Sequence, residues 1–173
     1  MTTIHASAVL IGPRAVLIRG PSDAGKSRLA YAVIEAARTG LIAFARLVGD
    51  DRVHVEAAHG RLLARPAQAL AGLIEIRGLG IRRVPYEPLA AIGLVVDLGA
   101  ADAERLPMPT DVEVAGIALP RLVVAPGAEP MPILFAALNS TDSARQTALP
   151  GVTALQKNYL ANASALLRST PTW

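Results

Sequence analysis

The feature that most constrains the fold of this chain is a glycine-rich octapeptide near its amino terminus. Residues 20–27 fit the pattern G-x-x-x-x-G-K-S/T of the phosphate-binding P-loop. A short apolar run precedes it at residues 15–18, and apolar residues at helical spacing follow it as far as Arg38. Strand, glycine loop and helix give the context that the motif requires, whereas a glycine-rich turn before an ordinary helix is the plainer alternative.

The expected chemistry of this loop is phosphate binding. Its backbone N–H groups and the helix N-terminus form a concave site for anions. Lys26 is placed to reach the β- and γ-phosphates, and the Ser27 hydroxyl is placed to bind Mg²⁺. Only two of the 17 Lys and Arg residues are lysines, so this Arg-rich chain keeps a compact ammonium at position 26. The predicted nucleotide-binding residues are Gly20, Pro21, Ser22, Asp23, Ala24, Gly25, Lys26 and Ser27.

Composition bounds the class of protein. A chain of 173 residues, 52% apolar, suits one globular domain over residues 1–173. Only 3% of the residues are aromatic and the arginines are scattered, so we expect no nucleic-acid partner. The absence of Cys excludes disulfides and thiolate metal sites. Arg14 interrupts the first apolar stretch, and the longest apolar run, residues 89–96, is too short to span a membrane. We therefore expect a soluble, cytoplasmic protein.

Acidic residues end two of the apolar runs. Asp50 and Asp51 follow residues 46–49, and the carboxyl edge of a sheet is where ligands bind in open α/β folds. One of them could accept a hydroxyl proton while the other caps the backbone or contacts a metal, but a turn with two solvated acids fits the pattern equally well. Asp97 ends residues 91–96 and competes for the metal role, because P-loop proteins commonly place a strand-end Asp on Mg²⁺.

The segment 73–84 combines charge with glycine. Glu75 and Arg77 alternate with isoleucines, so a strand would place both charged groups on one face, and a Glu suits a hard cation. The glycines that follow let the backbone approach a ligand. An amphipathic edge strand with paired charges is the alternative.

Other patterns predict the rest of the fold. A first strand over residues 4–12 contains His5, which by itself is typical of a surface residue. The remaining expected elements are hairpins at 53–64 and 112–119, a strand at 121–125, helices at 131–139 and within 152–167, and a polar connection at 140–150.

Three motifs together resemble the catalytic domain of HPr kinase/phosphorylase. They are the P-loop, Leu-Val-Gly-Asp-Asp-Arg-Val at 47–53 and Ile-Glu-Ile-Arg-Gly-Leu-Gly-Ile at 74–81. This bacterial family phosphorylates a seryl residue of HPr, the phosphocarrier protein of the sugar phosphotransferase system. The third motif is similar to the family's signature and is far more specific than a P-loop. The resemblance runs from about residue 5 to residue 132 and predicts a short form without the family's usual N-terminal domain.

The resemblance implies catalytic roles for four residues. His5 and Lys26 hold the family's spacing and would be active-site residues. Asp51 looks like the base that deprotonates the substrate serine and the acid of the reverse step. Arg105, in a Glu-Arg-Leu sequence, is similar to the family's catalytic arginine, although the connection that leads to it is shorter here.

The resemblance also implies the ligands, the fold and the assembly. ATP would be the phosphate donor, with Mg²⁺ held by Ser27 and Glu75. The fold would be α/β, a P-loop kinase domain resembling phosphoenolpyruvate carboxykinase, with a mixed sheet and flanking helices. The partner would be an HPr-like phosphocarrier protein, and the protein would form a homo-oligomer, a hexamer as is usual in the family.

One loop departs from the family. Bifunctional members carry arginines around the Pro-Gly pair of residues 126–127, whereas this chain has Ala125, Ala128 and Glu129. Attack of phosphate on phosphoserine brings two anions together and demands local positive charge, so we expect a kinase with weak or absent phosphorylase activity. Two alternatives stay open: a P-loop NTPase or small-metabolite kinase that uses Asp97, and a non-catalytic nucleotide-sensing module.

Overall fold

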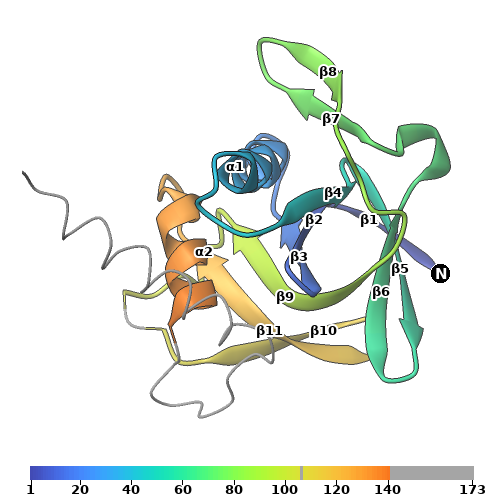
Figure 1. Ribbon diagram of the computed structural model, residues 1–173. Helices are drawn as coiled ribbons and strands as arrows, with labels where there is room; N and C mark the ends of the chain where they lie inside the picture. The colour runs from blue at the N-terminus through green and yellow to red at the C-terminus, as the bar shows by residue number, and fades with distance from the viewer. Residues whose placement is uncertain (106, 141–173) are drawn as a thin grey trace, which may run out of the picture.

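The computed structural model describes residues 1–105 and 107–140, in which a large mixed sheet carries two α-helices on one face (Figure 1). The helices are α1 (Lys26–Arg38) and α2 (Pro130–Asn139), and a short 3₁₀ helix spans Gln68–Leu70. The large sheet contains β1 (Thr2–His5), β2 (Ser7–Ile11), β3 (Arg14–Arg19), β4 (Ala45–Gly49), β5 (Arg52–Ala58), β6 (Arg61–Pro66), β9 (Ala90–Leu98), β10 (Thr110–Val114) and β11 (Ile117–Val124). A separate hairpin is formed by β7 (Leu73–Ile76) and β8 (Gly80–Arg83).

The long strand β9 organises the sheet. The strand order is β1-β5-β6-β9-β3-β2-β4, and β11 with β10 joins β9 as a branch. The first residues of β9 pair with β6 and its last four with β11, while β3 pairs along its other edge. Only the pairs β3–β9 and β9–β11 are parallel among the described strands of this sheet. Their carboxyl ends therefore meet at one edge, where the P-loop leaves β3.

The central strands are buried on both faces, which explains their nearly continuous apolar sequences. In β3, Val16 and Ile18 face the helices, and Ala15 and Leu17 face the opposite side. The first face packs on α1 and α2, and the second is closed by residues of β5, β6, β10 and β11. This double burial fixes the position of the strand that feeds the P-loop.

The P-loop begins where the chain passes close to the end of β9. Gly20 has φ of +148°, and a Cβ built on it would lie 2.7 Å from the carbonyl oxygen of Leu98. Only glycine fits that approach without a shift of the backbone. The observed order of β3, loop and α1 confirms the strand, loop and helix that the sequence predicts.

Several predicted elements differ in detail from the observed ones. The expected first strand over 4–12 divides at Ala6, because β1 pairs with β5 whereas β2 pairs with β3 and β4. The segment 73–84 forms a hairpin, not one strand, since the chain turns at Gly78 with φ of +80°. The strand expected at 121–125 is the second half of a continuous β11.

The remaining predictions are either confirmed or concern residues outside the described ranges. The hairpin at 53–64 is β5–β6, and the helix at 131–139 is α2. The helix expected within 152–167 and the polar segment after residue 140 lie outside the described residues. The helices of the described residues all lack the length and apolar character that are needed to cross a membrane.

Candidate active site

The P-loop wraps around the ammonium of its own lysine. Lys26 is the first residue of α1 and is 93% buried by its surroundings, with 7% of its surface exposed. Its Nζ donates hydrogen bonds to the carbonyl oxygens of Gly20 (3.1 Å) and Pro21 (2.9 Å). Gly25, with φ of +91°, caps the helix without a side chain. The N-terminal N–H groups of α1 therefore open into the loop, as an anion site requires.

Asp50 is a buried carboxylate that joins three segments of the chain. It follows β4 and is 4% exposed. Its Oδ1 accepts hydrogen bonds from Ser27 Oγ (2.9 Å) and Ser7 Oγ (2.5 Å), and its Oδ2 accepts one from the backbone N–H of Glu75 (3.2 Å). These donors are neutral, and no ion pair within residues 1–105 and 107–140 involves Asp50. Its negative charge is thus hydrogen-bonded but not neutralised by the described part of the chain.

The two predicted magnesium ligands both contact Asp50. Ser27 does so through its hydroxyl and Glu75 through its backbone N–H, so both residues lie beside this carboxylate. A hydroxyl and carboxylates are oxygen donors of the kind that Mg²⁺ takes. Among the described residues no group of three or more His, Cys, Asp or Glu could hold a metal by itself. In proteins Mg²⁺ usually binds one or two carboxylates together with waters and substrate phosphates.

Asp51 stands beside Asp50 but is exposed and strained. It has φ of +64°, and the turn around it is closed by a hydrogen bond from the Arg52 N–H to the Asp50 carbonyl oxygen (2.8 Å). Such three-residue turns are rare, and strain of this kind clusters at functional sites. His5 Nδ1 lies 3.0 Å from Asp51 Oδ1 and 3.1 Å from its carbonyl oxygen. The structure therefore brings two predicted catalytic residues together at the edge of the sheet.

The segment 74–81 also reaches the P-loop. Arg77, in the turn of the β7–β8 hairpin, forms an ion pair with Asp23 of the loop. Together with the hydrogen bond from Glu75 to Asp50, this contact joins the three sequence motifs in space. Convergence of motifs that are far apart in sequence is the geometric requirement for one site.

Asp97 is held by arginines and is poorly placed to bind a metal. Its two carboxylate oxygens accept hydrogen bonds from Arg19 Nε and Nη2 (both 2.7 Å) and from Arg121 Nε (2.6 Å). Burial would raise the pKa of Asp97, but the hydrogen bonds from Arg19 and Arg121 outweigh it and hold that pKa below its ordinary value. Arg121 also binds Asp102 (2.5 Å). With both oxygens engaged by cations, Asp97 is part of an ion-pair network.

Arg105 is not connected to the rest of the predicted site. It is exposed in the connection between β9 and β10. No hydrogen bond or ion pair within the described ranges links it to the P-loop. Its catalytic role therefore stays a prediction.

Sequence reasoning missed Ser7. This serine is fully buried in β2, where its hydroxyl donates the short hydrogen bond to Asp50. The only sequence signal is a polar residue between two alanines in an apolar run. Such a signal does not identify a partner 43 residues away.

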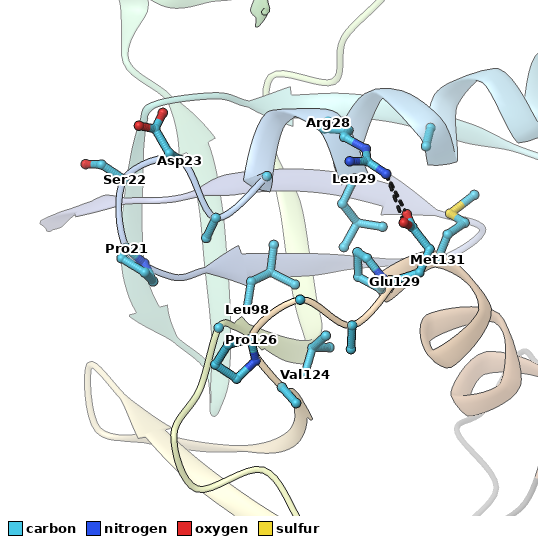
Figure 2. A pocket seen from close by; sticks show the side chains of 18 residues that line it. Pro21, Ser22, Asp23, Arg28, Leu29, Leu98, Val124, Pro126, Glu129 and Met131 are labelled. Atoms are coloured by element: carbon cyan, nitrogen blue, oxygen red, sulfur yellow. Dashed lines mark hydrogen bonds and ion pairs between the residues drawn. The ribbon is translucent and has the colours of Figure 1, made fainter.

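A pocket of about 460 Å³ adjoins the P-loop (Figure 2). One wall is the loop with the start of α1, and the other is formed by residues 98–99 and 124–131. An ion pair between Arg28 and Glu129 joins the two walls, with Nη2 lying 2.8 and 2.9 Å from the two carboxylate oxygens.

Comparisons with known proteins agree with the motifs. Residues 1–149 match the family described as HPr Serine kinase C-terminal domain. The chain is 42% identical over 81 residues to an HPr kinase/phosphorylase from Streptococcus thermophilus, which covers 46% of this chain and 24% of that protein. It is 32% identical over 136 residues to one from Halalkalibacterium halodurans, covering 71% of this chain and 42% of that protein. The chain thus spans only a minor part of these relatives.

A solved structure shares the fold. The Hpr(Ser) kinase/phosphatase from Coxiella burnetii superposes with a TM-score of 0.66 at 21% identity, covering 94% of this chain and 99% of that one. At this identity the likeness concerns the fold alone.

Proposed function

Because this chain belongs to the family of the HPr Serine kinase C-terminal domain, we propose that it transfers the γ-phosphoryl group of ATP to a serine hydroxyl of an HPr-like phosphocarrier protein. The observation that carries the proposal is the juxtaposition of a P-loop with two adjacent acids in different environments. Asp50 is buried and bonded to Ser27, whereas Asp51 is exposed and contacts His5. Phosphoryl transfer needs phosphates held in place, charge neutralised and a nucleophile oriented.

Each of these requirements has a candidate residue. Lys26 and the loop amides bind the β- and γ-phosphates. Asp51 accepts the proton of the substrate hydroxyl as its oxygen attacks the γ-phosphorus, and the bond to the bridging oxygen breaks to release ADP. The contact with His5 orients the Asp51 carboxylate. Exposure of Asp51 suits a substrate serine carried on another protein's surface, because such a serine approaches from solvent.

Magnesium would be held by Ser27 and Glu75 beside Asp50 and would neutralise charge on the phosphates when bound. The chain's own contribution is the placement of these oxygens. Asp50 receives the Ser27 hydroxyl and the Glu75 N–H on different carboxylate oxygens, so it sets the spacing of both residues. Because the Ser27 hydroxyl can rotate, its oxygen lone pairs remain available to a cation.

We further propose that the reverse, phosphorylase reaction is weak. The loop 125–129 lies at the pocket beside the P-loop and carries no arginine. The arginine next to it, Arg28, is paired with Glu129. Two other arginines that would be candidates to replace it are also paired, Arg77 with an acid of the P-loop and Arg121 with two acids. Around the loop 125–129, the described residues therefore offer little uncompensated positive charge to bring inorganic phosphate to phosphoserine.

The kinase proposal is tested by incubating the protein with ATP, Mg²⁺ and purified HPr and searching for phosphoserine by mass spectrometry. We expect one phosphoserine that requires ATP and is lost in Lys26→Ala. Lys26→Arg should not restore full transfer, since a planar guanidinium does not replace a compact ammonium among phosphates. ATP binding without any transfer to HPr would contradict the proposal and favour a nucleotide-sensing module.

The phosphorylase proposal needs a separate assay. Phosphoserine-HPr is incubated with millimolar phosphate and Mg²⁺, and pyrophosphate is measured. We expect release far below the forward rate. Release at a rate comparable to the kinase reaction would contradict this part of the proposal. Assembly into a homo-oligomer, a hexamer by resemblance, is a further proposal that light scattering can test.

A further inference from the structure

The buried hydroxyl of Ser7 is a feature of the core that the proposed function does not yet use. Ser7 is fully buried at the start of β2, between Ala6 and Ala8, which are fully buried as well. A hydroxyl in such a place costs free energy unless it finds a hydrogen-bond partner. Its partner is Oδ1 of Asp50, at 2.5 Å. Alanine is found on both sides of Ser7 and needs no partner, so packing alone does not explain the hydroxyl.

The donors around Asp50 fill its two carboxylate oxygens unequally. Ser7 and Ser27 both donate to Oδ1, whereas Oδ2 accepts one hydrogen bond within the described residues, from the backbone N–H of Glu75. An ionised carboxylate has about four acceptor positions, two on each oxygen. The protein therefore occupies both positions of Oδ1 and leaves one position of Oδ2 open, on the side of Glu75.

Ser7 differs from the other two donors in the rigidity of its support. It belongs to β2, which pairs with β3 on one side and with β4 on the other (Figure 1). Ser27 lies in the first turn of α1, at the P-loop, and Glu75 lies in the separate two-stranded hairpin β7–β8. The terminal torsion of an Asp side chain is soft, so a carboxylate is held in one rotation only by its hydrogen bonds. The large sheet supplies that restraint to Asp50 through Ser7.

The short segment 5–7 also holds the neighbouring acid. The backbone N–H of Ala6 donates to the carbonyl oxygen of Asp51 (3.3 Å), and His5 Nδ1 lies 3.0 Å from Asp51 Oδ1. Ser7 then reaches Asp50 from the same segment. Three consecutive residues thus contact two consecutive acids and keep one carboxylate buried and the other exposed.

We propose that Ser7 is a positioning residue of the magnesium site. Its hydroxyl fixes the rotation of the Asp50 carboxylate, and through Asp50 it sets the places of Ser27 and Glu75, the two proposed magnesium ligands. This inference rests on the proposed use of ATP with Mg²⁺ at the P-loop. Ser7 itself contacts neither the nucleotide nor the metal. Loss of its hydroxyl should therefore change the demand for Mg²⁺ and leave the binding of phosphates by Lys26 intact.

The test is ATP binding in the absence of HPr, measured by calorimetry at a series of Mg²⁺ concentrations and at a temperature at which the variants are folded. Ser7→Ala should raise the Mg²⁺ concentration needed for half-maximal binding by roughly tenfold, the lower end of the effect of altering a residue that orients metal ligands. The affinity for ATP at saturating Mg²⁺ should stay close to that of the unsubstituted protein. Ser7→Thr keeps the hydroxyl and should restore the original requirement for Mg²⁺.

Two further variants separate this role from a purely structural one. Ala8→Gly removes a buried methyl group from the next residue of β2 and disturbs the strand without removing a contact of Asp50, so the Mg²⁺ requirement should not change. Ser7→Ala added to Asp50→Asn should raise the requirement no further than Asp50→Asn alone, because Ser7 acts through that carboxylate. This comparison does not depend on whether Ser7→Thr folds.

The outcomes distinguish this inference from the function beneath it. An unchanged Mg²⁺ requirement in Ser7→Ala, an equal rise in Ala8→Gly, or additive effects of Ser7→Ala and Asp50→Asn would overturn the inference alone. A folded Ser7→Thr that needs as much Mg²⁺ as Ser7→Ala would do the same. Failure of the unsubstituted protein to bind ATP at any Mg²⁺ concentration, or binding that survives Lys26→Ala, would overturn the proposed function and the inference with it.

Discussion

Asp50 and Asp97 both end buried strands at the edge where the P-loop begins, yet they have opposite surroundings. Asp50 accepts hydrogen bonds from two serine hydroxyls and a backbone N–H. Asp97 accepts hydrogen bonds from two guanidinium groups. Neutral donors leave the charge of the first carboxylate available to a cation, whereas arginines compensate that of the second. The same local pattern, an acid after an apolar run, thus has two different outcomes.

The difference lies in partners that are distant in sequence. Ser7 reaches Asp50 from β2, and Arg121 reaches Asp97 from β11. The register of β3 on β9 places Arg19 directly beside Asp97. An acid at a strand end therefore becomes part of a site or part of the framework according to which residue the neighbouring strand supplies.

The largest expected effect on folding stability comes from Asp97→Asn. Removal of this charge leaves two part-buried arginines without their shared partner, and we expect a loss of about 3 kcal/mol in the free energy of unfolding, at the lower end for breaking a buried ion pair. Denaturant unfolding at pH 7 measures it. Asp102→Asn, which removes only the exposed acid that Arg121 also contacts, is the matched control and should destabilise the fold much less than Asp97→Asn. Equal losses of stability in Asp97→Asn and Asp102→Asn would show that Asp97 is not the acid that holds these arginines in the framework.

Asp50→Asn should act on the metal more than on the fold. The amide keeps the size of the side chain but loses the charge beside Ser27 and Glu75. We expect the Mg²⁺ concentration needed for nucleotide binding to rise by roughly 10–100-fold, the usual effect of altering a residue that orients metal ligands. Titration of Mg²⁺ at fixed ATP checks it, with Asp97→Asn as the comparison variant. A metal requirement raised in Asp97→Asn and unaltered in Asp50→Asn would reverse the assignment.

The smallest effect is a pH dependence. Because the pKa of Asp97 is lower in the folded protein than in the unfolded chain, the unfolded chain takes up the proton first as the pH falls. The stability that Asp97 contributes is therefore full above its ordinary pKa of about 3.9 and is lost as the pH falls through the lower, folded value. The difference between the unsubstituted protein and Asp97→Asn should shrink below about pH 4. A constant difference from pH 7 to pH 3 would show that the arginines do not lower this pKa.

Local patterns predicted the parts of the fold that depend on neighbours in sequence. The apolar run before Gly20 suffices to predict β3, because a strand that is buried on both faces is apolar throughout. The apolar residues at helical spacing after Lys26 suffice to predict α1, because one face of that helix is buried. The glycines at 78 and 80 predict a close approach of the backbone to a ligand, and the structure shows that Gly78 lies in the turn of a hairpin. Glycine allows both, and a single sequence does not choose between them.

The arrangement of the candidate site required information beyond local pattern. The resemblance to a family implied roles for His5, Asp51 and Glu75 but not their contacts, and the structure brings those residues to one edge. Neither source indicated Ser7 or the network around Asp97, because both depend on strand register. Arg105 stays a prediction that rests on resemblance alone.

The assignment of Asp51 as the base is tested by the initial rate of phosphoserine formation on HPr by Asp51→Asn and Asp97→Asn, compared at a temperature where both are folded. We expect Asp51→Asn to bind ATP normally but to transfer phosphate roughly 10²–10⁴ times more slowly, the usual contribution of a general base. Asp97→Asn should retain a rate close to that of the unsubstituted protein. A near-normal rate in Asp51→Asn together with loss of transfer in Asp97→Asn would contradict this assignment and place the chemistry at Asp97.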